Sequence, residues 1–382
     1  MARSPALSAE IELLPEPDKL DRFPSPRSTE RLYGQAAAEQ GFLDAFRSGR
    51  MHHAWIVAGP TGVGKATLCY RIARFLLAAE SERDMFGTSL DIDPATRAAR
   101  LVGNLSHPEL LVLRRPYNFQ TKKLKSEITV DEVRRLKGFL SMGAGEGWRV
   151  VIIDPIDELN TNAANALLKS LEEPPRRTVF LLVASAPDRL LPTIRSRCRM
   201  LAAGSLSDDD LRKAVAQALN ALEDAGAEAA LPSGEEWQTL SRLAEGSVRR
   251  LLMLQTGKGL DLYGKIAKLI AGLPRLDWVL VHQIGDELAS PAAEAKYELF
   301  FDLLLGVLAR LIRAGATGEG ERGDVELAAR LIPEERLAAW AQLWETTVAE
   351  KASTEIYNLD RKSLILLTFQ RIVQATRGAA PA

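Results

Sequence analysis

Cysteine and histidine are scarce in this sequence. Among its 382 residues there are two cysteines, Cys69 and Cys198, and four histidines. Two cysteines this far apart exclude a disulfide scaffold and any cysteine-based zinc site, and they are typical of a protein from a reducing compartment. His52 and His53 are the only histidines close in sequence, and adjacent residues of a strand point to opposite faces. We therefore expect no structural zinc.

The chain also lacks a strong net charge and a long hydrophobic run. Its 49 basic and 50 acidic residues give a formal net charge of −1, so no overall basic field favours the wrapping of nucleic acid. No apolar run reaches the roughly 18 residues of a membrane helix, and the N-terminus lacks the parts of a signal peptide. These absences predict a cytoplasmic protein. The length and the 46% hydrophobic content predict two or three domains with packed cores.

The pattern of apolar residues changes along the chain. Residues 1–30 hold prolines and charges without a sustained apolar period, which predicts an irregular N-terminal arm. Residues 31–203 alternate apolar runs with amphipathic stretches, which predicts a doubly wound α/β domain with a parallel sheet. The expected strands are HAWIVAG, RVVIID and TVFLLVAS, and the expected helices are AAAEQGFLDAFRSG, ATLCYRIARFLLAA, VDEVRRLKGFL and NTNAANALLKSLEEPP. A small helical domain over 204–262 and a larger one over 263–382 should follow.

The stretch GPTGVGKAT nearly matches the phosphate-binding loop G-x-x-x-x-G-K-[ST], beginning at Gly59. Gly62 and Gly64 permit positive φ, so that successive backbone N–H groups can cradle a phosphate. Lys65 would neutralise phosphate oxygens, and the N-terminus of the following helix adds its dipole. A glycine-rich turn without a ligand is the alternative, but the expected strand before the loop and helix after it favour a P-loop.

Two replacements predict that this loop does not support efficient hydrolysis. Ala66 stands where a hydroxyl should hold magnesium, and Thr67 comes one position later, rotated by about 100° around the helix. Asp154, at the end of RVVIID, has the position of the acid that holds magnesium through water. The next residue, where many such ATPases carry the glutamate that activates water, is Pro155, and Glu158 is expected to be a surface acid. The loop therefore predicts at most the binding of ATP or ADP.

A basic segment, Arg114–Lys125, mixes five basic residues with two aromatic ones. Such a mixture can bind single-stranded nucleic acid, with bases stacked on the aromatic rings. A solvated basic loop or hairpin is the favoured interpretation, because charge clusters commonly solvate a surface.

Three other stretches are specific in combination. They are NALLKSLEEPP (Asn165–Pro175), FLLVASAPDRLLPTIRSRC (Phe180–Cys198) and GSVRRLL (Gly246–Leu252). Through them the chain after residue 30 resembles the AAA+ subunits of clamp loaders. The replacements at Ala66 and Pro155, with NLDRK near the C-terminus, make the resemblance strongest to the delta-prime subunits of bacterial DNA polymerase III.

This resemblance implies roles for individual residues. Arg197, within the Ser-Arg-Cys motif, matches the arginine that reaches the ATP site of a neighbouring subunit. Ser185 matches the sensor-1 position, with Ala184 where a threonine is common, and Arg249 matches the sensor-2 arginine. Many relatives carry a four-cysteine zinc module after the P-loop helix. Residues 78–110 contain no cysteine, so no zinc is expected there either.

The implied function is that of a stator in the clamp loader, which places the sliding clamp on primed DNA during replication. The implied partners are subunits of the gamma/tau and delta types, with the clamp and primed DNA reached through the complex. Residues 204–262 would form a lid, and residues 263–382 a collar for oligomerisation. Any ATPase activity of its own should be weak or absent. Two alternatives stay open, an autonomous P-loop ATPase and a DNA-binding adaptor that uses Arg114–Lys125.

Overall fold

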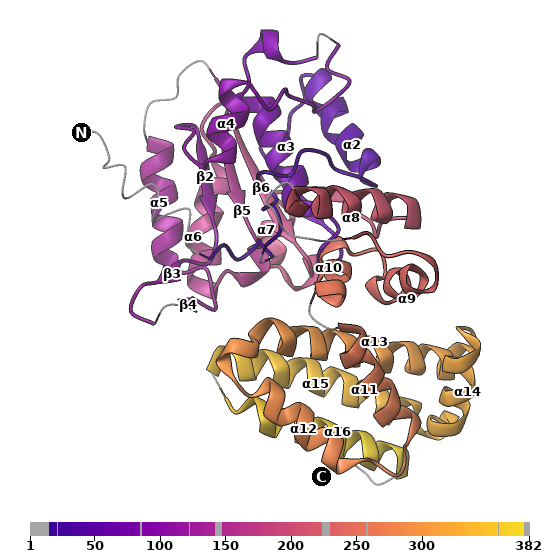
Figure 1. The fold of residues 1–382 in the computed structure, drawn as a ribbon. Helices are drawn as coiled ribbons and strands as arrows, with labels where there is room; N and C mark the ends of the chain where they lie inside the picture. Colours follow the sequence, from indigo (N-terminus) through magenta and orange to yellow (C-terminus); the bar gives the residue numbers. More distant parts are fainter. Residues whose placement is uncertain are drawn as a thin grey trace. The chain divides into compact units, whose positions relative to one another are not determined.

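The computed structural model describes residues 15–377, apart from residues 21, 85, 122, 142–146, 224–229, 257–258 and 358. The chain divides into two compact units between Leu251 and Leu252. The first unit contains a sheet flanked by helices, and the described part of the second unit is helical (Figure 1). Residues 1–14 of the predicted arm lie outside the described residues, and its described residues between 15 and 30 form turns and irregular backbone.

The first unit is built on a five-stranded parallel sheet (Figure 1). In spatial order its strands are β2 (Leu110–Leu113), β5 (Arg149–Ile153), β6 (Thr178–Ala184), β1 (Ala54–Ala58) and β7 (Arg199–Ala202). Every residue of β1, β5 and β6 is buried, which explains why these three strands are continuous apolar runs in the sequence. Their prediction is confirmed, whereas the two edge strands were not predicted.

Helices cover both faces of this sheet (Figure 1). The helices that bear on it are α2 (Ala36–Arg47), α3 (Lys65–Leu77), α5 (Val130–Ser141) and α6 (Thr161–Glu172). Successive residues of β1 show the two layers. The Trp55 ring packs on Phe42 of α2, with 5.5 Å between ring centroids. Ile56 belongs instead to the core that α5 and α6 close. The doubly wound α/β architecture is confirmed.

Only helices follow β7 in the described part of the chain. The first unit ends with α8 (Asp208–Glu223), α9 (Gly234–Ala244) and the start of α10 (Val248–Thr256). The second unit contains α11 (Gly259–Ala271), α12 (Trp278–Leu288), α13 (Glu294–Thr317), α14 (Arg322–Leu331), α15 (Leu337–Tyr357) and α16 (Arg361–Arg377). The predicted sequence of an α/β domain followed by helices is therefore confirmed. A separate lid over 204–262 stays a prediction.

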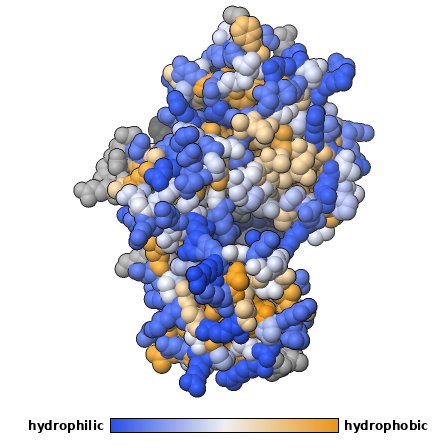
Figure 2. Space-filling model, turned by 90° about the vertical axis from the view of Figure 1, so that its right-hand side faces the viewer, coloured by the Kyte–Doolittle hydropathy of each residue, from blue (hydrophilic) through white to orange (hydrophobic). Residues whose placement is uncertain are grey.

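Large apolar side chains fill the core of the second unit. Those that are almost completely buried include Trp340, Tyr297, Phe300, Phe301 and Phe369. On the face drawn in Figure 2, hydrophobic residues are interspersed with hydrophilic ones on each unit, which is usual for folded domains. Among the described residues, no helix is long and apolar enough to cross a membrane.

The start of α6 is fixed by a side-chain cap. Asn160 has extended backbone angles, and its side chain accepts a hydrogen bond from the backbone N–H of Ala163, at 2.9 Å. This bond satisfies one of the N–H groups that a helix leaves without an internal partner. Pro174 and Pro175 follow the last turn and prevent the helix from continuing.

We expect Asn160→Ala to lower the free energy of unfolding by about 1 kcal/mol, because the cap is lost from a helix that packs on the sheet. Asn160→Asp should retain most of the stability, since a carboxylate also accepts the bond and suits the positive end of the helix dipole. Urea denaturation of the three proteins measures both changes. An alanine variant as stable as the wild type would show that the cap contributes nothing.

Candidate functional site

The predicted site residues of the first unit converge at the carboxyl edge of its sheet. The glycine loop follows β1, Asp154 follows β5, and Ser185 follows β6. Because neighbouring parallel strands end at the same edge, residues far apart in sequence meet there. The Nζ atom of Lys65 lies 3.0 Å from the Oγ atom of Ser185, although 120 residues separate them.

The glycine loop keeps the backbone form of a phosphate-binding loop. Gly62 and Gly64 have φ angles of +81° and +99°, which favour glycine. A Cβ atom at Gly62 would lie 2.3 Å from the Oγ of Ser247, so a side chain is also excluded by space. The carbonyl oxygen of Gly62 accepts a hydrogen bond from Val248 N, at 3.0 Å. The loop is therefore bonded directly to the first turn of α10.

Gln35 supports the loop next to Gly62. This side chain is only 3% exposed, and its Nε2 donates to the carbonyl oxygens of Val63 (3.0 Å) and Gly204 (2.8 Å). Its Oε1 accepts from the backbone N–H of Gly204. One buried amide thus joins the loop to the segment that leaves β7. The sequence offered no signal for this role.

Lys65 is turned back onto its own loop. Its Nζ donates to the carbonyl oxygens of Gly59 (2.7 Å) and Pro60 (2.6 Å), as well as to Ser185. Burial lowers the pKa of Lys65 to about 8, against the opposing influence of Asp154 and nearby Asp157. The donors that would neutralise phosphate oxygens are therefore used within the protein.

Asp154 lies where the sequence predicted, directly after β5, but in an environment that favours its neutral form. The side chain is buried, and its Oδ2 atom has no hydrogen-bond partner among the described residues. Burial raises the pKa of Asp154 to about 8, with added repulsion from Asp18 and Glu158, while Lys65 acts in the opposite direction. A protonated carboxyl group is a poor ligand for magnesium.

The other predicted residues are placed less centrally. Thr67 is buried within α3. Arg249 donates through Nη1 to the backbone carbonyl oxygen of Asp18, at 3.4 Å. Asp157, which the sequence analysis did not single out, accepts from the backbone N–H of Ser185 at 2.5 Å and so holds the turn after β6. It could have been found only from its position in the turn that follows Asp154.

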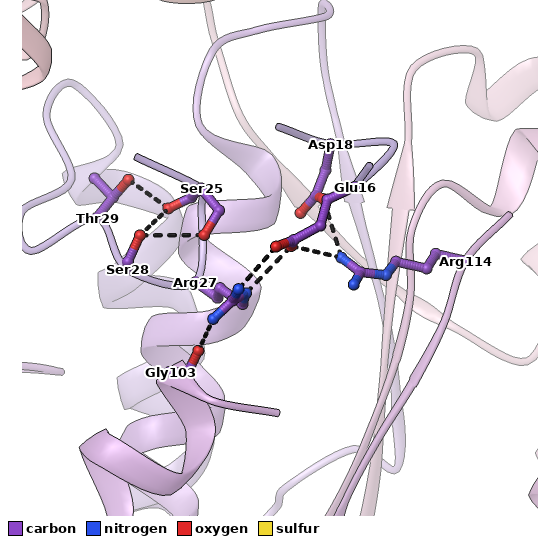
Figure 3. A network of polar contacts seen from close by, with 8 residues as sticks. All are labelled: Glu16, Asp18, Ser25, Arg27, Ser28, Thr29, Gly103 and Arg114. Atoms are coloured by element: carbon purple, nitrogen blue, oxygen red, sulfur yellow. Dashed lines mark hydrogen bonds and ion pairs between the residues drawn. The ribbon is translucent and has the colours of Figure 1, made fainter. Parts of the chain in front are cut away.

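Two carboxylates from the N-terminal arm enter this region, and neither was predicted from the sequence. Nη1 of Arg114 lies 2.8 Å from Glu16 and 3.2 Å from Asp18, and Nη2 of Arg27 lies 2.7 Å from Glu16 (Figure 3). The two acidic side chains are only 8% and 9% exposed. Burial favours the neutral acid, but hydrogen bonds from the two arginines outweigh it and lower the pKa of Glu16 to about 2.

These contacts correct the expectation of a solvated basic segment. As expected, a two-stranded antiparallel hairpin forms, from β3 (Tyr117–Asn118) and β4 (Lys123–Leu124). The Arg114 side chain before it, however, is only 22% exposed and is paired with the arm. Arg115 is paired at 2.8 Å with Glu158, the expected surface acid, whose side chain is 29% exposed. The first two cations of the segment are thus engaged within the protein.

Arg197 lies in the turn between α7 (Pro192–Arg195) and β7. Its side chain is 34% exposed, and Nη2 lies 2.6 Å from a carboxylate oxygen of Glu172, at the end of α6. Nη1 donates to the carbonyl oxygen of Thr193, at 2.8 Å. The guanidinium is therefore at the surface, held by an ion pair that joins two of the motifs singled out in the sequence.

The residues present do not fit a magnesium-bound nucleoside triphosphate in this arrangement. Lys65 and Arg249 are both bonded to backbone carbonyl oxygens, Ala66 offers no hydroxyl, and burial raises the pKa of Asp154 to about 8. The backbone of a phosphate cradle is kept without the side-chain chemistry that normally acts with it. Within the described ranges, no three His, Cys, Asp or Glu side chains are grouped so that they could hold a metal ion.

Comparisons with known proteins find similarity to subunits of DNA polymerase III. Residues 34–206 match the family described as DNA polymerase III, delta subunit. A DNA polymerase III subunit delta' from Pseudomonas aeruginosa is 40% identical over 147 residues, which cover 38% of this chain and 41% of the relative. The Escherichia coli subunit delta' is 34% identical over 157 residues, 41% of this chain and 43% of the relative. The chain thus spans about two fifths of the length of these relatives.

Similarity extends to related subunits and to one solved structure with a similar name. The Escherichia coli DNA polymerase III subunit tau is 28% identical over 245 residues, 60% of this chain and 32% of that protein. A DNA polymerase III gamma subunit-related protein from Thermotoga maritima covers 88% of this chain and is itself covered completely, at 17% identity and a TM-score of 0.36.

Asp154 should make stability dependent on pH. Its folded pKa is raised to about 8 from 3.8, so between these values the folded chain retains a proton that the unfolded chain has lost. Stability therefore falls as pH rises through this window, by up to about 1.4 kcal/mol per pH unit. Asp154→Asn should remove this component. The free energy of unfolding of the variant, relative to that of the wild type, should therefore increase from pH 5 to pH 8.

Urea denaturation at several pH values measures this difference. Asp131→Asn is a matched control, because Asp131 is 74% exposed. It should follow the wild-type profile. Parallel profiles for wild type and Asp154→Asn would show that Asp154 ionises normally in the folded protein.

Proposed function

We propose that the chain is a delta-prime-like stator of a clamp loader, because residues 34–206 match the family described as DNA polymerase III, delta subunit, and two bacterial subunits delta' are 40% and 34% identical to parts of the chain. A stator is a subunit that turns over no ATP itself and holds a catalytic neighbour in position. Subunits of the gamma/tau and delta types are the proposed partners. The sliding clamp and primed DNA would be reached through the complex. The all-helical second unit is the proposed collar that joins the subunits.

The state of the phosphate-binding loop is the observation that carries this proposal. Its backbone is held in place by α10 and Gln35, while Lys65 is bonded to the loop itself. Ala66 and Pro155 supply neither the hydroxyl nor the carboxylate that hydrolysis needs. Such a loop can maintain a shape without a chemical cycle, which suits a stator.

An autonomous P-loop ATPase is disfavoured by the same contacts. A DNA-binding adaptor is disfavoured because Arg114 and Arg115 are paired with acids of the same unit. We also propose that the chain binds no structural zinc. Elemental analysis of tag-free protein tests that point, and one zinc ion per chain would contradict it.

The proposed contribution to catalysis is Arg197, acting on the ATP site of a neighbouring subunit. The guanidinium is planar and permanently charged, and it can donate two hydrogen bonds to phosphate oxygens. In the isolated chain it is paired with Glu172, which is 46% exposed. A pair at this degree of exposure contributes little, so a phosphate can compete with it. This support comes from position and chemistry alone.

The isolated protein should show negligible ATP turnover, because the metal-binding hydroxyl and the water-activating base are both absent. Steady-state ATPase measurements on protein freed of contaminants by ion exchange provide the test. Lys65→Ala is the control and should leave the background rate unchanged. Turnover typical of P-loop ATPases that Lys65→Ala abolishes would establish the autonomous ATPase instead.

Arg197→Ala should leave folding and assembly intact, yet lower the clamp-stimulated, DNA-dependent ATPase of the reconstituted complex. We expect the ATPase rate to fall roughly threefold to tenfold. An arginine supplied in trans contributes a factor of roughly 10³–10⁵ to turnover in GTPases with a single active site, but a loader has several active sites, so the loss of one arginine should cost less. Arg197→Lys should rescue little, since a lysine offers only a point charge.

Arg195→Ala is the matched control for Arg197→Ala. Arg195 is the last residue of α7, two positions before Arg197, and it is 43% exposed, with Asp188 at 3.4 Å. Its loss should matter less. An Arg197→Ala complex that assembles normally and loads clamps at the wild-type rate would rule out the trans role.

A further inference from the structure

The arm segment, residues 15–20, lies among the groups that would surround a phosphate in the first unit. The carbonyl oxygen of Asp18 takes the hydrogen bond from Arg249, the predicted sensor-2 residue. After burial, Asp18 is the strongest influence that raises the pKa of Asp154. It acts in the same direction on the pKa of Tyr70, on the helix that follows the loop, which burial raises most. The arm thus reaches both the strand end and the first turn of α10.

We propose that the arm segment is the built-in occupant of the degenerate nucleotide site and excludes nucleotide from it. Asp18 engages the site from its backbone and from its carboxylate, and Glu16 holds the segment in place. This inference goes beyond the proposed stator role. It rests only on contacts within the first unit and holds whether or not the chain joins a clamp loader.

The arm is anchored firmly enough to act as an occupant. Glu16 accepts from two arginines of different segments, Arg27 and Arg114, through short charge-assisted bonds. Nη1 of Arg27 also donates to the carbonyl oxygen of Gly103, at the end of α4 (Arg97–Gly103) (Figure 3). Further along the arm, the Phe23 side chain is only 3% exposed.

A turn after Phe23 holds the arm where it approaches α2. The carbonyl oxygen of Ser25 accepts from the hydroxyl groups of Ser28 (3.0 Å) and Thr29 (3.1 Å), both shown in Figure 3. Displacing the arm would leave Arg114 without the partners of a largely buried cation, which is costly.

Electrostatic repulsion, in addition to the lack of space, would keep nucleotide out of the site. The phosphates of ATP or ADP carry several negative charges, and Glu16, whose pKa is lowered to about 2 by its two arginines despite burial, places a carboxylate charge beside the site. Burial raises the pKa of Asp18, against the influence of Arg114, so its carboxyl group adds mainly bulk. Like charges brought together with little solvent repel one another strongly. The cations that would offset a phosphate, Lys65, Arg114 and Arg249, all have partners within the chain.

The test is ADP binding by the full chain, measured by isothermal titration calorimetry with and without magnesium. The double variant Glu16→Gln/Asp18→Asn keeps the size of both side chains and removes their charge. It should bind ADP about tenfold or more tightly than the wild type. The control Asp44→Asn/Glu326→Gln removes the same charge at side chains that are 63% and 66% exposed. It should match the wild type.

Limited trypsin digestion supplies a readout that a merely destabilised protein would not give. Lys19, Arg22 and Arg27 are cleavage sites within the arm. In the double variant, ADP should accelerate cleavage at these sites while protecting the rest of the unit, because nucleotide and arm compete for one place. In the wild type, ADP should change nothing.

A chain that lacks residues 1–20 provides a second route if the double variant fails to fold. Circular dichroism and thermal melting establish which variants are folded, and a folded truncated chain should also bind ADP more tightly. Wild-type protein that binds ADP while its arm stays protected would overturn the proposal. So would folded variants that bind ADP no better than the wild type.

Discussion

At the carboxyl edge of the sheet, buried cations and acids compensate one another within the chain. Arg114 is paired with Glu16 and Asp18, and the ammonium group of Lys65 is bonded to carbonyl oxygens of its own loop. Burying a charge without a partner is expensive, and within this chain the buried cations of the edge have such partners. Asp154 lies at the same edge, and burial raises its pKa to about 8.

The loop keeps the backbone conformation of a phosphate-binding loop but lacks some of the side chains that catalysis requires. Gly62 and Gly64 keep positive φ angles, and α10 approaches so closely that no side chain could replace Gly62. These constraints come from packing within the chain. The chemical groups at Ala66 and Pro155 are under no such constraint. The surviving glycines therefore reflect the fit between loop and helix as much as any ligand.

The elements predicted from sequence are those with a strong local signal. Strands β1, β5 and β6 are buried on both faces and are therefore continuous apolar runs. The edge strand β7 has a single buried residue in four and leaves no such pattern. Strand β2 precedes a basic stretch that obscured it.

The missed site residues share a different cause. Arg114 contacts Glu16 across 98 positions of the chain, and no periodicity reports a contact of that range. The proximity of Lys65 and Ser185 could be predicted only because neighbouring parallel strands end at the same edge of the sheet.

The hydrogen bond from Arg249 to the carbonyl oxygen of Asp18 connects the start of α10 to the arm, and both partners are part of the same chain. Where a bound nucleotide makes such a connection instead, the occupancy of the site depends on the nucleotide concentration. A tether within the chain has a fixed effective concentration, set by the length of the connecting segment. If the arm occupies the site as proposed, the geometry of this edge would not depend on the ratio of ATP to ADP in the cell.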